Sequence, residues 1–226
     1  MSFPRRVEAV VFDMDGLLLD TEIVYRAAMI EAGSVFDVHF TGETYAAMVG
    51  KTTPECGLML RDLYGDEFPV QAYFERVWAD VEDLLAAETR LKAGVIEILD
   101  YLDDRGLPRG IATSNGMIAV EKYLGRFDLL RRFNAVVAHQ DVTRHKPNPD
   151  PYLLAAERLG VDPAHCLALE DSHPGVRAAH AAGMMTIMVP DILDPNEEMH
   201  DKCVHIADSL HHVLDLLKAS VEEMAA

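Results

Sequence analysis

Short apolar runs rich in branched residues alternate along the chain with segments whose apolar residues recur at helical spacing. The apolar runs are 7–12, 109–113, 135–138, 166–169 and 185–189. Between them, 94–106 and 149–160 carry apolar residues three and four positions apart and end at a glycine, as many helices do. Strands that alternate with helices are typical of a parallel sheet covered on both faces. The pattern therefore predicts an α/β fold with a doubly wound parallel sheet.

The segment 21–89 departs from this alternation. It has helical spacing and no convincing strand, and it is too long for an ordinary connection between two strands. We expect an inserted α-helical cap, hinged near 18–20 and 89–94, although an irregular helical wrapping of the sheet would fit the same pattern. The predicted domains are a catalytic α/β core, 1–20 with 90–226, and a helical cap, 21–89.

The net charge excludes several classes of partner. A formal charge of −18 and a pI near 4.8 repel nucleic acid and anionic membranes. No apolar run approaches the ~20 residues of a membrane span, and the acid within "VEAVVFDMDG" interrupts any signal-peptide core. We expect a cytoplasmic monomer or weak dimer whose partner is a small molecule.

Polar residues gather where the predicted strands end. In an open parallel sheet, ligands bind outside the carboxyl ends of the strands. Those ends carry Asp13 and Asp15 after the first strand, Thr113, Ser114 and Asn115 after the second, Lys146 in the loop after the third, and Glu170 and Asp171 after the fourth.

Four carboxylates at one edge require a cation, and hard oxygen ligands suit Mg²⁺. Magnesium held by carboxylates commonly shares a substrate phosphate, and a lysine with nearby hydroxyls would complete an anion site. One aspartate of the first strand can then act as a nucleophile on phosphorus, while the other serves the leaving group as an acid. The sequence predicts magnesium-dependent phosphoryl transfer.

Four stretches carry a family resemblance. "VVFDMDGLLLDTE", "IATSN", "HKPNPDPYLLAAERLG" and "ALEDSHPGVRAAHAAGM" resemble the four motifs of the haloacid dehalogenase superfamily. The chain is similar to the branch with a helical cap after the first strand, which includes β-phosphoglucomutases and sugar-phosphate phosphatases. This resemblance implies that Asp13 is a nucleophile forming an aspartyl-phosphate and that Asp15 is the general acid and then the base.

The same resemblance implies the remaining site residues. Thr113 and Lys146, with Ser114, Asn115 and the turn residue Gly16, would hold the phosphoryl group and substrate. Magnesium would be held by Asp13, the backbone carbonyl of Asp15, Glu170 and Asp171.

Departures from the family pattern narrow the chemistry. The second aspartate, Asp15, argues against carbon–halogen cleavage. β-Phosphoglucomutases place a histidine and an arginine in the cap where this chain has Tyr25 and Thr53, and Lys51 is the only basic residue of that loop. We expect a phosphatase acting on a small phosphorylated metabolite such as a sugar phosphate, with Lys51 contacting the substrate. The alternatives are a β-phosphoglucomutase-like phosphotransferase and a non-catalytic binding scaffold.

Overall fold

A six-stranded parallel sheet forms the centre of the α/β part of the chain. The computed structural model describes residues 3–49, 51 and 53–225. The strands are β1 (Ala9–Phe12), β2 (Arg109–Ala112), β3 (Ala135–Val137), β4 (Cys166–Glu170), β5 (Met185–Met188) and β6 (His205–Ile206). Their order in the sheet is β3-β2-β1-β4-β5-β6, and every pair is parallel. The predicted doubly wound α/β fold is confirmed.

The five strands expected from the apolar runs are all present, and their ends lie within two residues of the expected ones. The sixth strand, β6, was not expected. It has only two residues, both half-buried. A pair of residues cannot display the alternation of period two by which a strand is recognised in sequence.

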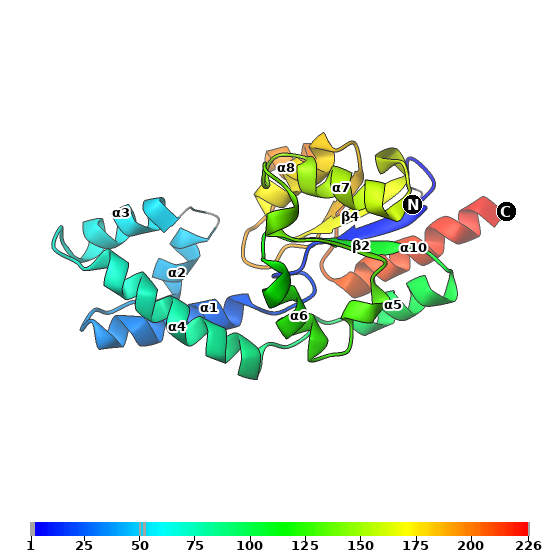
Figure 1. Cartoon of the computed structure of the whole chain (residues 1–226). Helices are drawn as coiled ribbons and strands as arrows, with labels where there is room; N and C mark the ends of the chain where they lie inside the picture. The colour runs from blue at the N-terminus through cyan, green and yellow to red at the C-terminus, as the bar shows by residue number, and fades with distance from the viewer. Residues whose placement is uncertain (1–2, 50, 52, 226) are drawn as a thin grey trace. The chain divides into compact units, whose positions relative to one another are not determined.

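Helices cover both faces of the sheet (Figure 1). The helices of this part of the chain are α5 (Val95–Asp104), α6 (Met117–Gly125), α7 (Asp150–Leu159), α8 (His173–Ala181), α9 (Glu197–Lys202) and α10 (Leu210–Ala225). In Figure 1, α7 and α8 lie on one face of the sheet, and α5 and α10 lie on the other. The core beneath α7 and α8 is rich in alanine, which lets these helices approach the strands closely.

The alternation along the two central strands determines where their terminal carboxylates point. Val11 of β1 and Ala168 of β4 belong to the core beneath α7 and α8. Asp13 and Glu170 follow them two positions later, on the same face, because side chains alternate with a period of two along a strand. The Asp13 amide donates to the Leu169 carbonyl at 3.0 Å, so the ladder continues one residue beyond β1.

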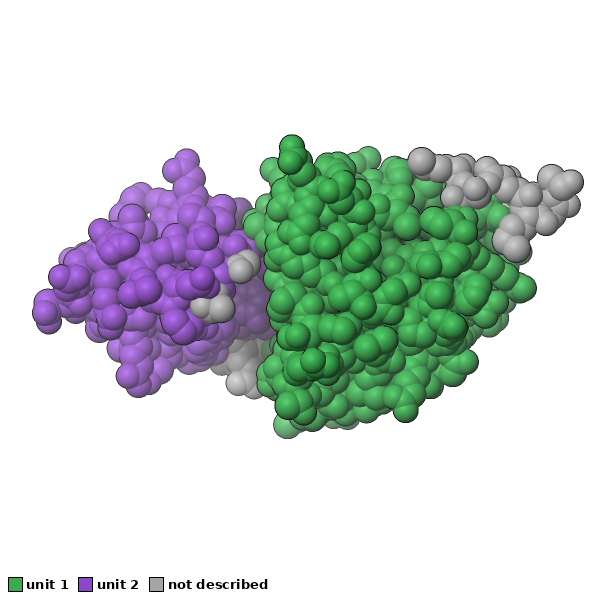
Figure 2. Space-filling view, turned by 90° about the horizontal axis from the view of Figure 1, so that it is seen from above, with its two compact units in different colours: residues 1–19, 91–226 green, residues 20–90 purple. Residues whose placement is uncertain are grey.

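The chain divides into two compact units, shown in different colours in Figure 2. The α/β unit comprises Met1–Leu19 and Leu91–Ala226, and the helical unit comprises Asp20–Arg90. The helical unit consists of α1 (Glu22–Val35), α2 (Gly42–Met48), α3 (Thr53–Tyr64) and α4 (Val70–Glu88), with no strand among its described residues. The expected helical insertion after the first strand is therefore confirmed as part of the fold.

The helical unit has its own aromatic core. Tyr73 is fully buried, and its hydroxyl donates to the Met29 carbonyl at 2.8 Å. The rings of Phe36, Phe40 and Phe68 surround it, with centroid distances of 5.5–6.0 Å. Gly50 and Thr52, on either side of Lys51, lie outside the described residues. Among the residues that the structure describes, no helix is both long and apolar enough to cross a membrane.

Candidate active site

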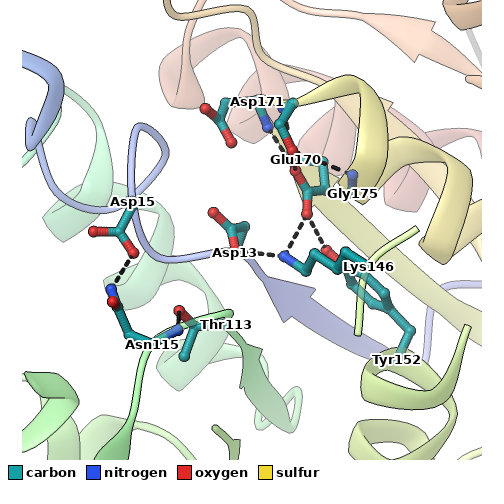
Figure 3. A network of polar contacts seen from close by, with 10 residues as sticks. Asp13, Asp15, Thr113, Asn115, Lys146, Tyr152, Glu170, Asp171 and Gly175 are labelled. Carbon is teal, nitrogen blue, oxygen red and sulfur yellow. Dashed lines mark hydrogen bonds and ion pairs between the residues drawn. The ribbon is translucent and has the colours of Figure 1, made fainter. Parts of the chain in front are cut away.

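A buried lysine joins two carboxylates at the carboxyl edge of the sheet (Figure 3). Lys146 Nζ donates to Asp13 Oδ1 at 2.5 Å and to Glu170 Oε1 at 2.6 Å. The side chains of Asp13 and Lys146 are 10% and 7% exposed, and that of Glu170 is fully buried. The structure thus brings together three of the residues predicted from the sequence, although Lys146 lies 133 positions from Asp13.

Glu170 is saturated with hydrogen-bond donors. Its Oε1 also accepts from the Tyr152 hydroxyl at 2.6 Å. Its Oε2 accepts from the Asp171 amide at 3.1 Å, and from the amide and hydroxyl of Ser172 at 3.2 and 3.0 Å. A carboxylate has about four lone-pair sites, so five donors leave little capacity for a direct metal bond. The geometry favours Glu170 as the group that fixes Lys146.

Asp15 belongs to a second group of polar contacts in the same view. Asn115 Nδ2 donates to Asp15 Oδ2 at 2.5 Å, and the Asn115 amide donates to Thr113 Oγ1 at 3.0 Å. Thr113 is buried and continues the ladder of β2, since its amide donates to the Val137 carbonyl at 3.0 Å. Ser114, between them, has an exposed side chain. Asp13 and Asp15 therefore have different polar partners, which suits two different chemical roles.

Three carboxylates converge where a cation is expected. One oxygen each of Asp13, Glu170 and Asp171 lies within 4.8 Å of the other two. Ligands about 2.1 Å from a magnesium ion stand up to about 4.2 Å apart, so the spacing fits such an ion after small side-chain adjustments. Because Glu170 is already saturated, Asp13 and Asp171 are the better direct ligands. This donor set consists of hard oxygens, which suits magnesium.

The electrostatics of the edge also favour a cation. Burial raises the pKa of Asp13 to about 7, an effect that Lys146 opposes and that the charges of Glu170 and Asp15 reinforce. Burial and the charges of Asp13 and Glu170 raise the pKa of Asp171 well above its ordinary value. Burial alone would lower the pKa of Lys146, but its two carboxylate partners outweigh burial and raise it. Lys146 thus stays charged, yet offsets only part of the negative charge.

Two glycines allow the carboxylates to approach the backbone. A Cβ atom at Gly175, in the first turn of α8, would stand 1.8 Å from Glu170 Oε1. A Cβ atom at Gly16 would stand 2.3 Å from Asp171 Oδ2, and Gly16 has a φ of +77°, which glycine tolerates best. The structure thus shows a packing role for Gly16 beside Asp171, and the predicted role of Gly16 in substrate binding remains a prediction.

Lys51 belongs to the helical unit, where its side chain is exposed and its amide donates to the Met48 carbonyl at 3.0 Å. It lines a cavity of about 190 Å³ within that unit, together with aromatic side chains that include Tyr25 and Trp78. The contact between Lys51 and a substrate remains a prediction.

Two residues of the site were not predicted from the sequence. Tyr152 comes from α7, and Ser172 is the N-cap of α8, where its hydroxyl accepts from the Gly175 amide at 3.2 Å. The N-cap could have been recognised, since Ser172 stands just before the proline-containing start of a predicted helix. Tyr152 gave no such signal, because its contact with Glu170 depends on how α7 packs across the sheet.

Comparison with known proteins identifies the family. Residues 10–189 match the family model described as haloacid dehalogenase-like hydrolase. The chain belongs to this family, as its four motifs predicted, and it is a hydrolase by that membership.

Two of the similar curated proteins are named as phosphatases. Hexitol phosphatase B of Escherichia coli is 35% identical over 198 residues, which cover 84% of this chain and 86% of that protein. Fructose-1-phosphate phosphatase YqaB of the same species is 31% identical over 196 residues, covering 82% and 97%. The crystal structure of CbbY from Rhodobacter sphaeroides in complex with phosphate is similar in fold. The two structures match with a TM-score of 0.74 and 28% sequence identity, and the match covers 92% of this chain and 96% of that one.

Replacing Gly175 tests the packing of Glu170. In Gly175→Ala the new methyl group must displace the Glu170 carboxylate, and we expect a loss of about 1–3 kcal/mol in the free energy of unfolding. Gly125→Ala is the matched control, since Gly125 also lies in a helix and a Cβ there meets no atom within 4 Å. Urea unfolding followed by circular dichroism measures both. Equal stability of the two variants would contradict the contact.

Proposed function

We propose that the chain is a magnesium-dependent phosphatase that hydrolyses the phosphomonoester of a small phosphorylated metabolite, such as a sugar or sugar-alcohol phosphate. The observation that carries this proposal is the buried Asp13 carboxylate, held by Lys146 beside Asp171, with a second aspartate two positions along. The named phosphatases among its relatives support the same class of reaction.

Asp13 is the proposed nucleophile. An oxygen of its carboxylate forms a bond to phosphorus, while the bond from phosphorus to the substrate alcohol oxygen breaks, which leaves a phosphoryl group on Asp13. Lys146 stays charged at its buried position and would stabilise the negative charge of the transferring group. Its second contact, with the fixed carboxylate of Glu170, holds the ammonium in place during the step.

Asp15 is the proposed acid and base. It donates a proton to the departing alcohol oxygen and later takes a proton from the water that attacks phosphorus, which releases inorganic phosphate and restores Asp13. The hydrogen bond from Asn115 to Asp15 Oδ2 would hold the Asp15 carboxyl group in place for this proton exchange. Thr113, Ser114 and Gly16 complete the set of residues proposed to hold the phosphoryl group and the substrate.

Asp13 and Asp171 would hold the magnesium ion with the backbone carbonyl of Asp15, and Glu170 would support the site through Lys146. When bound, the ion would neutralise the carboxylates and the substrate phosphate, so that Asp13 stays ionised at neutral pH. The acidic excess of the edge and the spacing of its oxygens support this assignment.

A phosphatase is favoured over a β-phosphoglucomutase-like phosphotransferase. Tyr25 and Thr53 stand where those mutases carry a histidine and an arginine, and the relatives described above are named as phosphatases. We propose that the single positive charge of Lys51 recognises a polar or anionic group on the substrate. A lysine is a flexible point charge without the forked geometry of arginine, so this contact would tune affinity without enclosing a second phosphate.

Chelation tests the metal requirement. We expect no turnover of p-nitrophenyl phosphate in excess EDTA and full recovery on adding Mg²⁺, because the carboxylate edge repels an anionic substrate. Calcium should inhibit, since its larger and looser coordination misplaces the nucleophile. Undiminished hydrolysis after thorough chelation would rule out the magnesium-dependent mechanism.

Two isosteric substitutions separate the roles of the aspartates. Asp13→Asn should abolish phosphoryl transfer, with at least a ~10³-fold lower rate, because an amide is a poor nucleophile. Asp15→Asn should still accept a phosphoryl group from p-nitrophenyl phosphate, whose leaving group needs no proton, and then stall at hydrolysis. Rapid-quench kinetics and intact-protein mass spectrometry measure both steps. A wild-type rate in Asp13→Asn would show that the nucleophile is another residue.

Substitution of Lys51 tests substrate recognition. Lys51→Ala should raise KM for the preferred sugar phosphate by roughly tenfold, which corresponds to the loss of about 1.4 kcal/mol. It should leave KM for p-nitrophenyl phosphate nearly unchanged. Arg26→Ala is the control, since it removes one exposed positive charge from the same unit. Equal changes on both substrates would contradict the role of Lys51. Conversion of β-glucose 1-phosphate to glucose 6-phosphate faster than phosphate release would identify a mutase.

A further inference from the structure

A further carboxylate, Asp191, lies at the acidic edge just after β5. Its Oδ1 accepts a hydrogen bond from Lys92 Nζ at 2.6 Å, and the two side chains are only 14% and 27% exposed. Lys92 is itself fixed to the segment after β1, because its amide donates to the Leu18 carbonyl at 3.0 Å. Because Lys92 is anchored in this way, its ion pair holds the Asp191 carboxylate in one orientation.

The other oxygen of Asp191 points toward Gly16, as an oxygen of Asp171 does. Oδ2 is buried and has no hydrogen-bond partner among the described residues. It lies 3.3 Å from the place where a Cβ atom of Gly16 would stand, and Asp171 Oδ2 lies 2.3 Å from the same point. Both carboxylates thus turn an oxygen toward Gly16, next to Asp15, whose carbonyl is a proposed metal ligand.

A buried carboxylate oxygen without a donor is unfavourable, because the hydration that it lost is not replaced. Its neighbours Asp171 and Gly16 offer no side-chain donor when Asp171 is ionised. A magnesium ion in proteins usually keeps several water molecules, and these are strong donors. Such a water would satisfy the Asp191 oxygen.

We propose that Asp191 is a positioning residue of the metal site and that Lys92 holds it in place. Asp191 Oδ2 would accept a hydrogen bond from a water molecule on the ion bound by Asp13 and Asp171. This inference rests on the proposed function, since it requires the metal. Asp191 does not touch the reacting atoms and acts on them through the ion. Outer-shell partners of this kind typically change metal affinity by 10–100-fold.

Magnesium affinity is the direct readout. In Asp191→Asn, the amide oxygen keeps the contact with Lys92, so the amide nitrogen takes the place of Oδ2 and offers a donor where an acceptor is required. Isothermal titration of the full chain with MgCl₂ should show a Kd raised roughly tenfold or more. Asp194→Asn is the matched control, because Asp194 is exposed on the same loop and the same charge is removed. Its Kd should match the wild type.

Asp191→Glu adds a rescue. It keeps the charge and the acceptor, and it should recover most of the magnesium affinity lost in Asp191→Asn. An equal Kd for Asp191→Asn and Asp194→Asn would overturn the inference. If Asp191→Asn also has a lower melting temperature in EDTA while its Kd is unchanged, the ion pair of Lys92 with Asp191 is purely structural, and the inference is overturned as well. Wild-type protein that binds no magnesium would instead refute the metal in the proposed function.

Discussion

The bond of one buried lysine to two carboxylates is the interaction on which the rest of the site depends. Lys146 is almost fully enclosed, and removing a charge from water is unfavourable unless it is paired and hydrogen-bonded. Asp13 and Glu170 supply that pairing, from strands that are neighbours in the sheet. Glu170 is fixed in turn by hydrogen bonds from Tyr152 and Ser172, so each buried charge in this network is paired or hydrogen-bonded.

This pairing leaves an excess of negative charge at the carboxyl edge of the sheet. That excess is the reason why a cation is expected there. Asp171 and Asp15 add to the charge of Asp13, and burial raises the pKa of Asp13 to about 7. A divalent cation would relieve the repulsion and recruit a phosphate, which is otherwise repelled by a chain of formal charge −18. The proposed cation site and the proposed phosphate site are therefore two consequences of one electrostatic arrangement.

Backbone geometry is the second constraint on the edge. Gly16 and Gly175 leave room for the carboxylates of Asp171 and Glu170, and no larger residue fits at either position without displacing an oxygen. Lys92 and Asp191 complete the arrangement on the side of β5. The helical unit, with its separate aromatic core, contributes a different property, because its cavity beside Lys51 is where we expect substrate selection.

The sequence by itself determined the alternation of strands and helices, the helical insertion, and the set of residues at the strand ends, because periodicity and motif spacing are local properties of the chain. It also placed Asp13 and Asp15 correctly after the first strand. The contacts of Lys146 and Tyr152 with Glu170 and the pair of Lys92 with Asp191 were decided only by tertiary structure. These contacts join residues that are far apart in sequence, up to 99 positions for Lys92 and Asp191, and no local pattern encodes which side chains packing brings together.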